Sequence, residues 1–258
     1  MPHRDTLPPE PFLYRPERRS LAQNALAPEP LPCDEVAETG VAPEKGDCCR
    51  GYHHGDLRRG LLQVARDLLV ERGVPGTSLR AIARRAGVSN RAPYHHFEDK
   101  LSLLAELARE GFAEFTRRML EHESVEDPVE RLRRQGRSYV RFATEFPSDF
   151  EVMYWPELCD RENFPDREEC AKPAFDALIR ALSEIAGPNA TEEQLDEVAV
   201  AGWAGVHGLA TLQAQSVLSH LQEEGMGESE TAVIDGILDC TNRMLVGEAR
   251  RVGGLDCP

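Results

Sequence analysis

Five polar side chains between Ser89 and His95 belong to the residue types that read DNA. Asn90 and Arg91 follow a Gly-Val-Ser turn, where Arg can pair with O6 and N7 of guanine and Asn with adenine. Tyr94 and His95 come one helical turn later, within reach of phosphates. The run is too short and too polar to form core, so we interpret it as a DNA-reading surface.

Three further residues have the chemistry and position to hold the phosphate backbone. Ser78 and Ser89 each stand where a short helix is expected to begin, so hydroxyl and backbone N–H groups point outward together. Lys100 falls in the first turn of the next expected helix, beside its positive end. The candidate DNA-binding residues are therefore Ser78, Ser89, Asn90, Arg91, Tyr94, His95 and Lys100.

A helix–turn–helix would present these residues correctly, and the sequence meets its geometric demands. Thr77 or Ser78 can cap a second helix over 79–86, and Ser89 a third over about 90–96. Ala83 is small enough for close helix crossing, and Gly87 allows a positive φ at the corner. Apolar side chains close the turn from below and at its far end, namely Val88 and Phe97.

The charge distribution supports a local DNA-binding module. The chain has 258 residues and a net charge of −15, which argues against DNA binding over its whole surface. Residues 51–100 nevertheless hold nine Lys and Arg against five Asp and Glu, whereas 101–258 hold fifteen against thirty-one. A basic module attached to an acidic body is consistent with a localised electrostatic footprint.

Helical periodicity predicts an all-α fold in three parts. Residues 1–50 contain nine of the 18 prolines and are expected to be a disordered leader. Residues 51–100 form the three-helix DNA-binding domain, and 101–250 a helical regulatory and dimerisation domain. Gly73 is expected to stop the first helix, and residues 148–170 are ambiguous. The expected helices are 55–73, 79–86, 90–96, 99–119, 128–145, 173–186, 191–218 and 229–246.

The stretch GWAGVHGLATL, residues 202–212, suggests a helix that buries two faces. Gly202, Gly205 and Gly208 leave a flat strip for another helix, while Trp203 and His207 share a different face. We expect one face to pack within the protomer and the other near a dimer seam with the final helix. Six residues are candidates either for a ligand pocket or for core: Trp203, His207, Tyr139, Phe142, Phe146 and Tyr154.

The sequence offers little for other classes of function. We find no Gly-rich phosphate loop, nucleophile elbow or metal-ligand spacing, so neither an enzyme nor a cofactor is expected. Seven cysteines without a zinc pattern indicate free thiols in a reducing cytoplasm. No apolar run is long enough to span a membrane.

The segment from Tyr52 to Leu104 resembles the DNA-binding domain of the TetR family of bacterial regulators. The matching runs are YHHGDLRRGLL and TSLRAIARRAGVSNRAPYHHFEDKLSLL, and a W-x-x-x-H-G pattern at Trp203 resembles a regulatory domain of some members. The resemblance implies a homodimer on a palindromic double-stranded operator, usually a repressor, released by a small-molecule effector. Two alternatives stay open: a helical interaction module without DNA binding, and an activator without a small-molecule ligand.

Overall fold

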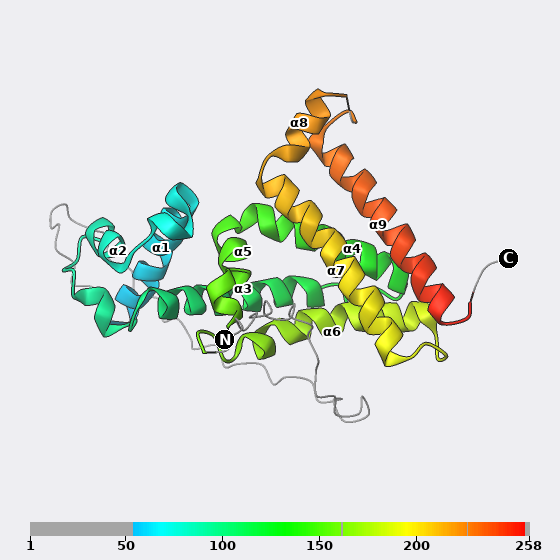
Figure 1. Ribbon diagram of the computed structural model, residues 1–258, viewed down its shortest axis with the longest axis horizontal. Coiled ribbons are helices and arrows are strands. Elements are labelled where there is room, and N and C mark those ends of the chain that lie inside the picture. Colours follow the sequence, from blue (N-terminus) through cyan, green and yellow to red (C-terminus); the bar gives the residue numbers. More distant parts are fainter. Residues whose placement is uncertain (1–53, 161, 226, 256–258) are drawn as a thin grey trace, which may run out of the picture. The chain divides into compact units, whose positions relative to one another are not determined.

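The computed structural model describes residues 54–160, 162–225 and 227–255, and in that part of the chain the regular elements are helices alone. The expected leader over 1–50 lies outside the described residues. Within them, no helix is long and apolar enough to cross a membrane. The principal helices are α1 (His54–Gly76), α2 (Leu79–Arg85), α3 (Lys100–Leu120), α4 (Pro128–Glu145), α5 (Pro147–Met153), α6 (Arg167–Ala186), α7 (Glu192–Ala214), α8 (Val217–Glu223) and α9 (Glu230–Val252) (Figure 1).

Local capping chemistry sets most of these boundaries. Asp99 begins α3 by accepting a hydrogen bond from the backbone N of Ser102, and the Ser102 hydroxyl accepts one from the backbone N of Asp99. Thr191 and Gln194 form the expected capping box at α7. Asp127 caps α4 ahead of Pro128, which occupies a first-turn position where proline loses no hydrogen bond.

The element order confirms the all-α prediction, but four helices differ from their expected ranges. α1 is kinked at Gly73, where its expected end lies, and runs on to Gly76. α6 begins at Arg167 rather than at residue 173, and α9 runs to Val252 rather than to residue 246. α7 ends at Ala214, because Ser216 takes a φ of 59° and α8 then begins. The ambiguous 148–170 segment holds α5, a 3-10 turn η3 (Pro156–Cys159) and the start of α6.

The third expected helix is a 3-10 turn, η2 (Ala92–His95). Pro93 has no N–H to donate to the Ser89 carbonyl, which instead accepts from the backbone N of Ala92 at 3.0 Å. The predicted Ser89 side-chain cap is therefore wrong. Arg91 occupies the cap position without a side-chain hydrogen bond, and Asn90 with Arg91 lies in the turn before η2.

The helices after η2 pack around two buried apolar clusters. α3 packs against α4, α5 and α6, while α4 packs against α6, α7 and α9, and α7 lies alongside α9 (Figure 1). Gly202 allows the α7–α9 approach, since a Cβ there would lie 2.8 Å from both methyl carbons of Leu245. Gly205 also faces α9, at Thr241, so the expected flat strip serves packing within the protomer at these two positions.

An ion pair between the partly buried Arg66 and the buried Asp149 ties α1 to α5. The guanidinium of Arg66 donates to both oxygens of Asp149 at 2.8–3.0 Å, and Asp149 is only 4% exposed. α3 lies close to the same region, because Gly111 leaves room for the side chains of Met153 and Asp149. α1, which opens the DNA-binding segment, is thus held directly by α5, which belongs to the helical body that follows residue 100.

Candidate nucleic-acid interface and aromatic core

The corner of the helix–turn–helix is fixed by its own backbone. Gly87 has a φ of 70°, as predicted, and its N–H donates to the Arg84 carbonyl at 3.3 Å. The N–H of Val88 donates to the Ala83 carbonyl at 3.0 Å, which completes a Schellman motif. Ala83 is fully buried at the crossing and Val88 packs on the core beneath it. The corner therefore leaves the following residues pointing away from the core.

The expected DNA-reading side chains are exposed together on this corner. Ser89, Asn90 and Arg91 are exposed in the turn, and Tyr94 is 51% exposed on η2 beside exposed His95. Phe97 is 4% exposed and closes the far end, with the guanidinium of Arg58 5.4 Å from its ring centroid. A recognition element that enters a DNA groove needs exposed polar side chains on one side and a buried residue that holds it to the domain on the other. The exposed residues of this turn and the buried Phe97 meet both requirements.

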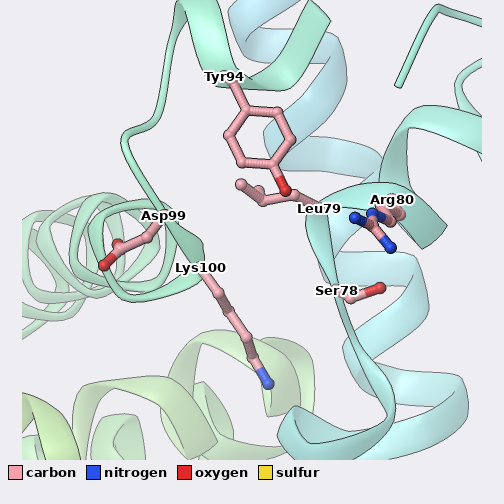
Figure 2. A pocket seen from close by; sticks show the side chains of 6 residues that line it. All are labelled: Ser78, Leu79, Arg80, Tyr94, Asp99 and Lys100. Atoms are coloured by element: carbon pink, nitrogen blue, oxygen red, sulfur yellow. The ribbon is translucent and has the colours of Figure 1, made fainter. Parts of the chain in front are cut away.

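A surface pocket of about 270 Å³ adjoins this edge (Figure 2). The Ser78 hydroxyl caps α2 by accepting from the backbone N of Ala81 at 3.2 Å. Lys100 reaches back to donate to the Val74 carbonyl at 2.5 Å, which uses one of the three N–H donors of its ammonium group. The lining residues are Ser78, Leu79, Arg80, Tyr94, Asp99 and Lys100. Three of the seven predicted DNA-binding residues, Ser78, Tyr94 and Lys100, thus line one recess.

Arg80 is a further candidate that the sequence analysis did not single out. It is exposed in the first turn of α2 and lines the recess with Ser78 and Lys100 (Figure 2). The sequence could have indicated Arg80, because it lies two residues after the N-cap Ser78 and the first turn of a helix faces an anion that binds at that end. Arg80 and Lys100 are thus two cationic side chains that line the same recess.

Four of the six candidate pocket residues form one hydrogen-bonded cluster. The Tyr139 hydroxyl lies 2.9 Å from Nδ1 of His207 and 3.1 Å from the Tyr154 hydroxyl, and Nε1 of Trp203 donates to it at 3.2 Å. One hydroxyl hydrogen and two lone pairs accommodate these three partners, with Tyr139 donating to a neutral His207. Burial lowers the pKa of His207 and raises the pKa values of Tyr139 and Tyr154, so all three are neutral at pH 7.

The remaining two candidates lie in a neighbouring part of the core. Phe142 is fully buried and stacks on Phe146 with ring centroids 5.3 Å apart, while the guanidinium of Arg118 lies 4.7 Å from the Phe146 ring centroid. Phe115 contacts both Phe142 and Tyr139 and so joins this pair to the hydrogen-bonded cluster. The structure brings the six residues into one continuous aromatic core rather than around one shared point.

The cysteines and acidic residues of the described part offer no metal centre. Cys159, Cys170 and Cys240 carry free thiols, as expected, and no group of three or more His, Cys, Asp or Glu could hold an ion within the residues described. Burial raises the pKa of the half-buried Cys170 thiol, which makes it less reactive. The other four cysteines fall outside the described residues.

Two segments of the chain match known protein families. Residues 61–107 match the family described as "Bacterial regulatory proteins, tetR family", and residues 132–237 match "Tetracyclin repressor-like, C-terminal domain". The transcriptional repressor Rv3405c of Mycobacterium tuberculosis is 36% identical over 133 residues, which cover 51% of this chain and 67% of that protein. The repressor KstR2 of the same organism is 41% identical over 78 residues, so the match spans 29% of this chain and only 38% of KstR2.

Solved structures share the fold. A protein with unknown function from Rhodococcus sp. RHA1 superposes with a TM-score of 0.61 at 30% identity, covering 76% of this chain and 96% of that one. AibR, in its complex with isovaleryl coenzyme A and operator DNA, gives a TM-score of 0.55 at 20% identity and covers 71% and 96%. The arrangement of α1 to α9 is therefore one that known regulators adopt.

Proposed function

We propose that this chain, which belongs to the TetR family of bacterial transcriptional regulators, is a cytoplasmic repressor that binds a palindromic DNA operator as a homodimer. In this proposal a small-molecule effector bound in the helical body shifts the dimer to a geometry that releases the operator. The relative Rv3405c is named a transcriptional repressor, which supports repression rather than activation.

The observation that carries the proposal is the exposed edge after the Schellman corner. Asn90 and Arg91 are held outward by a turn whose backbone is bonded on both sides of Gly87. Ser78, Arg80 and Lys100 line the adjoining recess, where phosphate oxygens would fit. Base-reading and phosphate-holding groups side by side on a rigid corner are suited to sequence-specific recognition.

The outward face of α7 and α9 supports a homodimer. Small and apolar residues are exposed there on two helices that pack against each other: Ala201, Ala204, Gly205, Gly208 and Leu212 on α7, with Gly236, Cys240, Met244 and Gly247 on α9. Met244 is 70% exposed, and a Cβ at Gly208, Gly236 or Gly247 would meet nothing within 4 Å. A second copy laid on this face would bury the apolar side chains at close helix separation.

The proposal is tested by titrating a duplex that the protein enriches from genomic fragments. Arg91→Ala should weaken binding by about 1–3 kcal/mol and relax the preference at one base position, since a bidentate contact to a base is lost. Lys100→Ala should weaken binding to all duplexes alike. Arg250→Ala, an exposed arginine at the end of α9, is the matched control and should change neither quantity. Equal affinities for wild type and Arg91→Ala on every duplex would defeat the proposal.

A further inference from the structure

We propose that the effector is an uncharged molecule with an adjacent hydrogen-bond donor and acceptor, such as a carboxamide, and that Gln135 binds it. The inference rests on the proposed regulatory function and names the ligand chemistry of the helical body. It concerns a residue that lies one helical turn before Tyr139 on α4 and is not part of the hydrogen-bonded aromatic cluster.

Gln135 is buried with its hydrogen-bonding groups unused. Gln135 is 5% exposed, and neither Nε2 nor Oε1 of its side chain has a hydrogen-bonding partner among the described residues. A buried amide that lacks partners is costly, and an apolar residue of the same size would avoid that cost. The position of Gln135 is therefore explained best by a partner that binds from outside the chain.

Gln135 lies where the two apolar clusters of the helical body separate. On α4, Leu132 belongs to one cluster and Tyr139 to the other, so Gln135 falls between them. The same division occurs on α7, where Ala199 belongs to the cluster that contains Leu132 and Trp203 packs against the cluster that contains Tyr139. On α6 it falls between Ala174 and Leu178. Three helices thus contribute to both clusters, and on α4 the unpartnered amide lies between a residue of one cluster and a residue of the other.

A second polar atom has the same property on the facing helix. Oγ1 of Thr116 on α3 is buried and has no hydrogen-bonding partner within the described residues. Thr116 is one turn after Phe112 on a helix that packs against both α4 and α6. Gln135 and Thr116 are therefore two buried polar groups without partners among the described residues, on two helices that pack against each other.

The charges around this level favour a neutral ligand. Arg131, one turn before Gln135, is already paired with both carboxylate oxygens of Glu184 at 2.7 and 3.0 Å. Asp149 is paired in the same bidentate way with Arg66. The hydroxyl of Tyr139 is fully used by its three partners. Two further buried oxygens of the described residues lack a hydrogen-bonding partner, Oε1 of Gln213 on α7 and Oδ1 of Asp239 on α9, and Asp239 is ion-paired with Arg133 at 3.1 Å. The unused groups on α3 and α4 are thus one donor–acceptor pair and one hydroxyl, and a charged ligand beside them would be desolvated without a counter-charge.

The planar amide of Gln135 is complementary to a second planar group of the same kind. A carboxamide, a lactam or a neutral carboxylic acid presents one N–H or O–H beside one carbonyl oxygen, which matches Oε1 and Nε2 in a two-bond pair. The apolar remainder of such a ligand would lie against the aromatic rings next to Tyr139. Benzamide contains both parts and serves as the probe.

The test compares four probes that share a ring and differ in the head group: benzamide, benzoate, benzylammonium and toluene. Dissociation constants for the full chain are measured by ligand-detected NMR titration with wild type, Gln135→Leu and the control Gln63→Leu. Gln63 is an exposed glutamine on α1 whose amide bonds to Asp67, so its loss removes an amide without touching the interior. We expect wild type and Gln63→Leu to prefer benzamide over each other probe by about ten-fold, and Gln135→Leu to reduce that preference to about two-fold or less.

Thermal unfolding of the ligand-free protein gives the second readout. Gln135→Leu should leave the unfolding midpoint unchanged or raise it, because it removes an unpaired buried amide. The proposal is overturned if wild type shows no preference for benzamide, if Gln135→Leu keeps the preference, or if it lowers the midpoint. Operator binding by wild type is measured separately. Loss of operator binding with intact benzamide preference would defeat the proposed function alone, and the reverse pattern would defeat the ligand assignment alone.

Discussion

The buried pair between Arg66 and Asp149 gives a prediction whose size follows from the structure. Asp149 is 4% exposed and accepts three hydrogen-bond contacts from Arg66, so Arg66→Met leaves an uncompensated carboxylate in the interior. Removing one partner of a buried pair costs about 3–5 kcal/mol. For a body of this size each kcal/mol lowers the unfolding midpoint by about 2–4 °C, so the fall should be roughly 6–20 °C.

Differential scanning calorimetry on single and double variants separates this cause from lost packing. Arg66→Met with Asp149→Asn should be more stable than the sum of the single changes implies, with a coupling energy of about 0.5–3 kcal/mol. Arg85→Met is the matched control, since Arg85 pairs with Glu71 in the same two-bond geometry at the surface and its loss should barely move the midpoint. A fall for Arg66→Met no larger than for Arg85→Met, or additive effects in the double variant, would refute the reasoning.

Three further predictions concern the helical body. Gly202→Ala should destabilise the fold by about 1–3 kcal/mol in urea titration, because its Cβ would meet Leu245 at 2.8 Å; unchanged stability would contradict the tight α7–α9 contact. Gly208→Leu should shift the protein toward monomer in sedimentation equilibrium, since only a second copy would meet that side chain, and any fall in its unfolding midpoint should come from the lost association; an unchanged dimer would place the seam elsewhere. Burial lowers the pKa of His207 below the 6.5 of the unfolded chain, so the free energy of unfolding should fall as the pH drops below about 6.5 and not change above it. His207→Asn should reduce that fall between pH 7.5 and 5.5, part of which belongs to His122, whose pKa is also lowered.

The elements that were predicted well are governed by neighbouring residues. Gly73 and Gly87 both take the positive φ that their positions indicated, and the capping residues of α3, α4 and α7 begin those helices. The error at η2 was also local, because Pro93 removes one backbone donor from a segment too short to compensate with other helical bonds.

Features that depend on distant contacts were not accessible from the sequence. α6 begins early because its first residues are anchored from α3, where Arg109 holds Asp166 with two hydrogen bonds of 2.6 and 2.8 Å and covers the buried Phe164 ring. Gln135 reads as an ordinary polar residue on an arginine-rich helix, and only the packing of α4 reveals its burial. The aromatic residues of the sequence indicated the aromatic core, whereas the buried amide without partners lies on the same helix one turn before Tyr139.

The most direct test of the account is selection of genomic DNA fragments by the purified full chain at moderate salt, followed by sequencing. We expect enrichment of one inverted repeat, because a homodimer presents two copies of the Asn90 and Arg91 edge to two half-sites. Weak retention that falls with salt and shows no sequence preference would contradict it. In that case the exposed corner would not read bases, and a helical interaction module would become the better description.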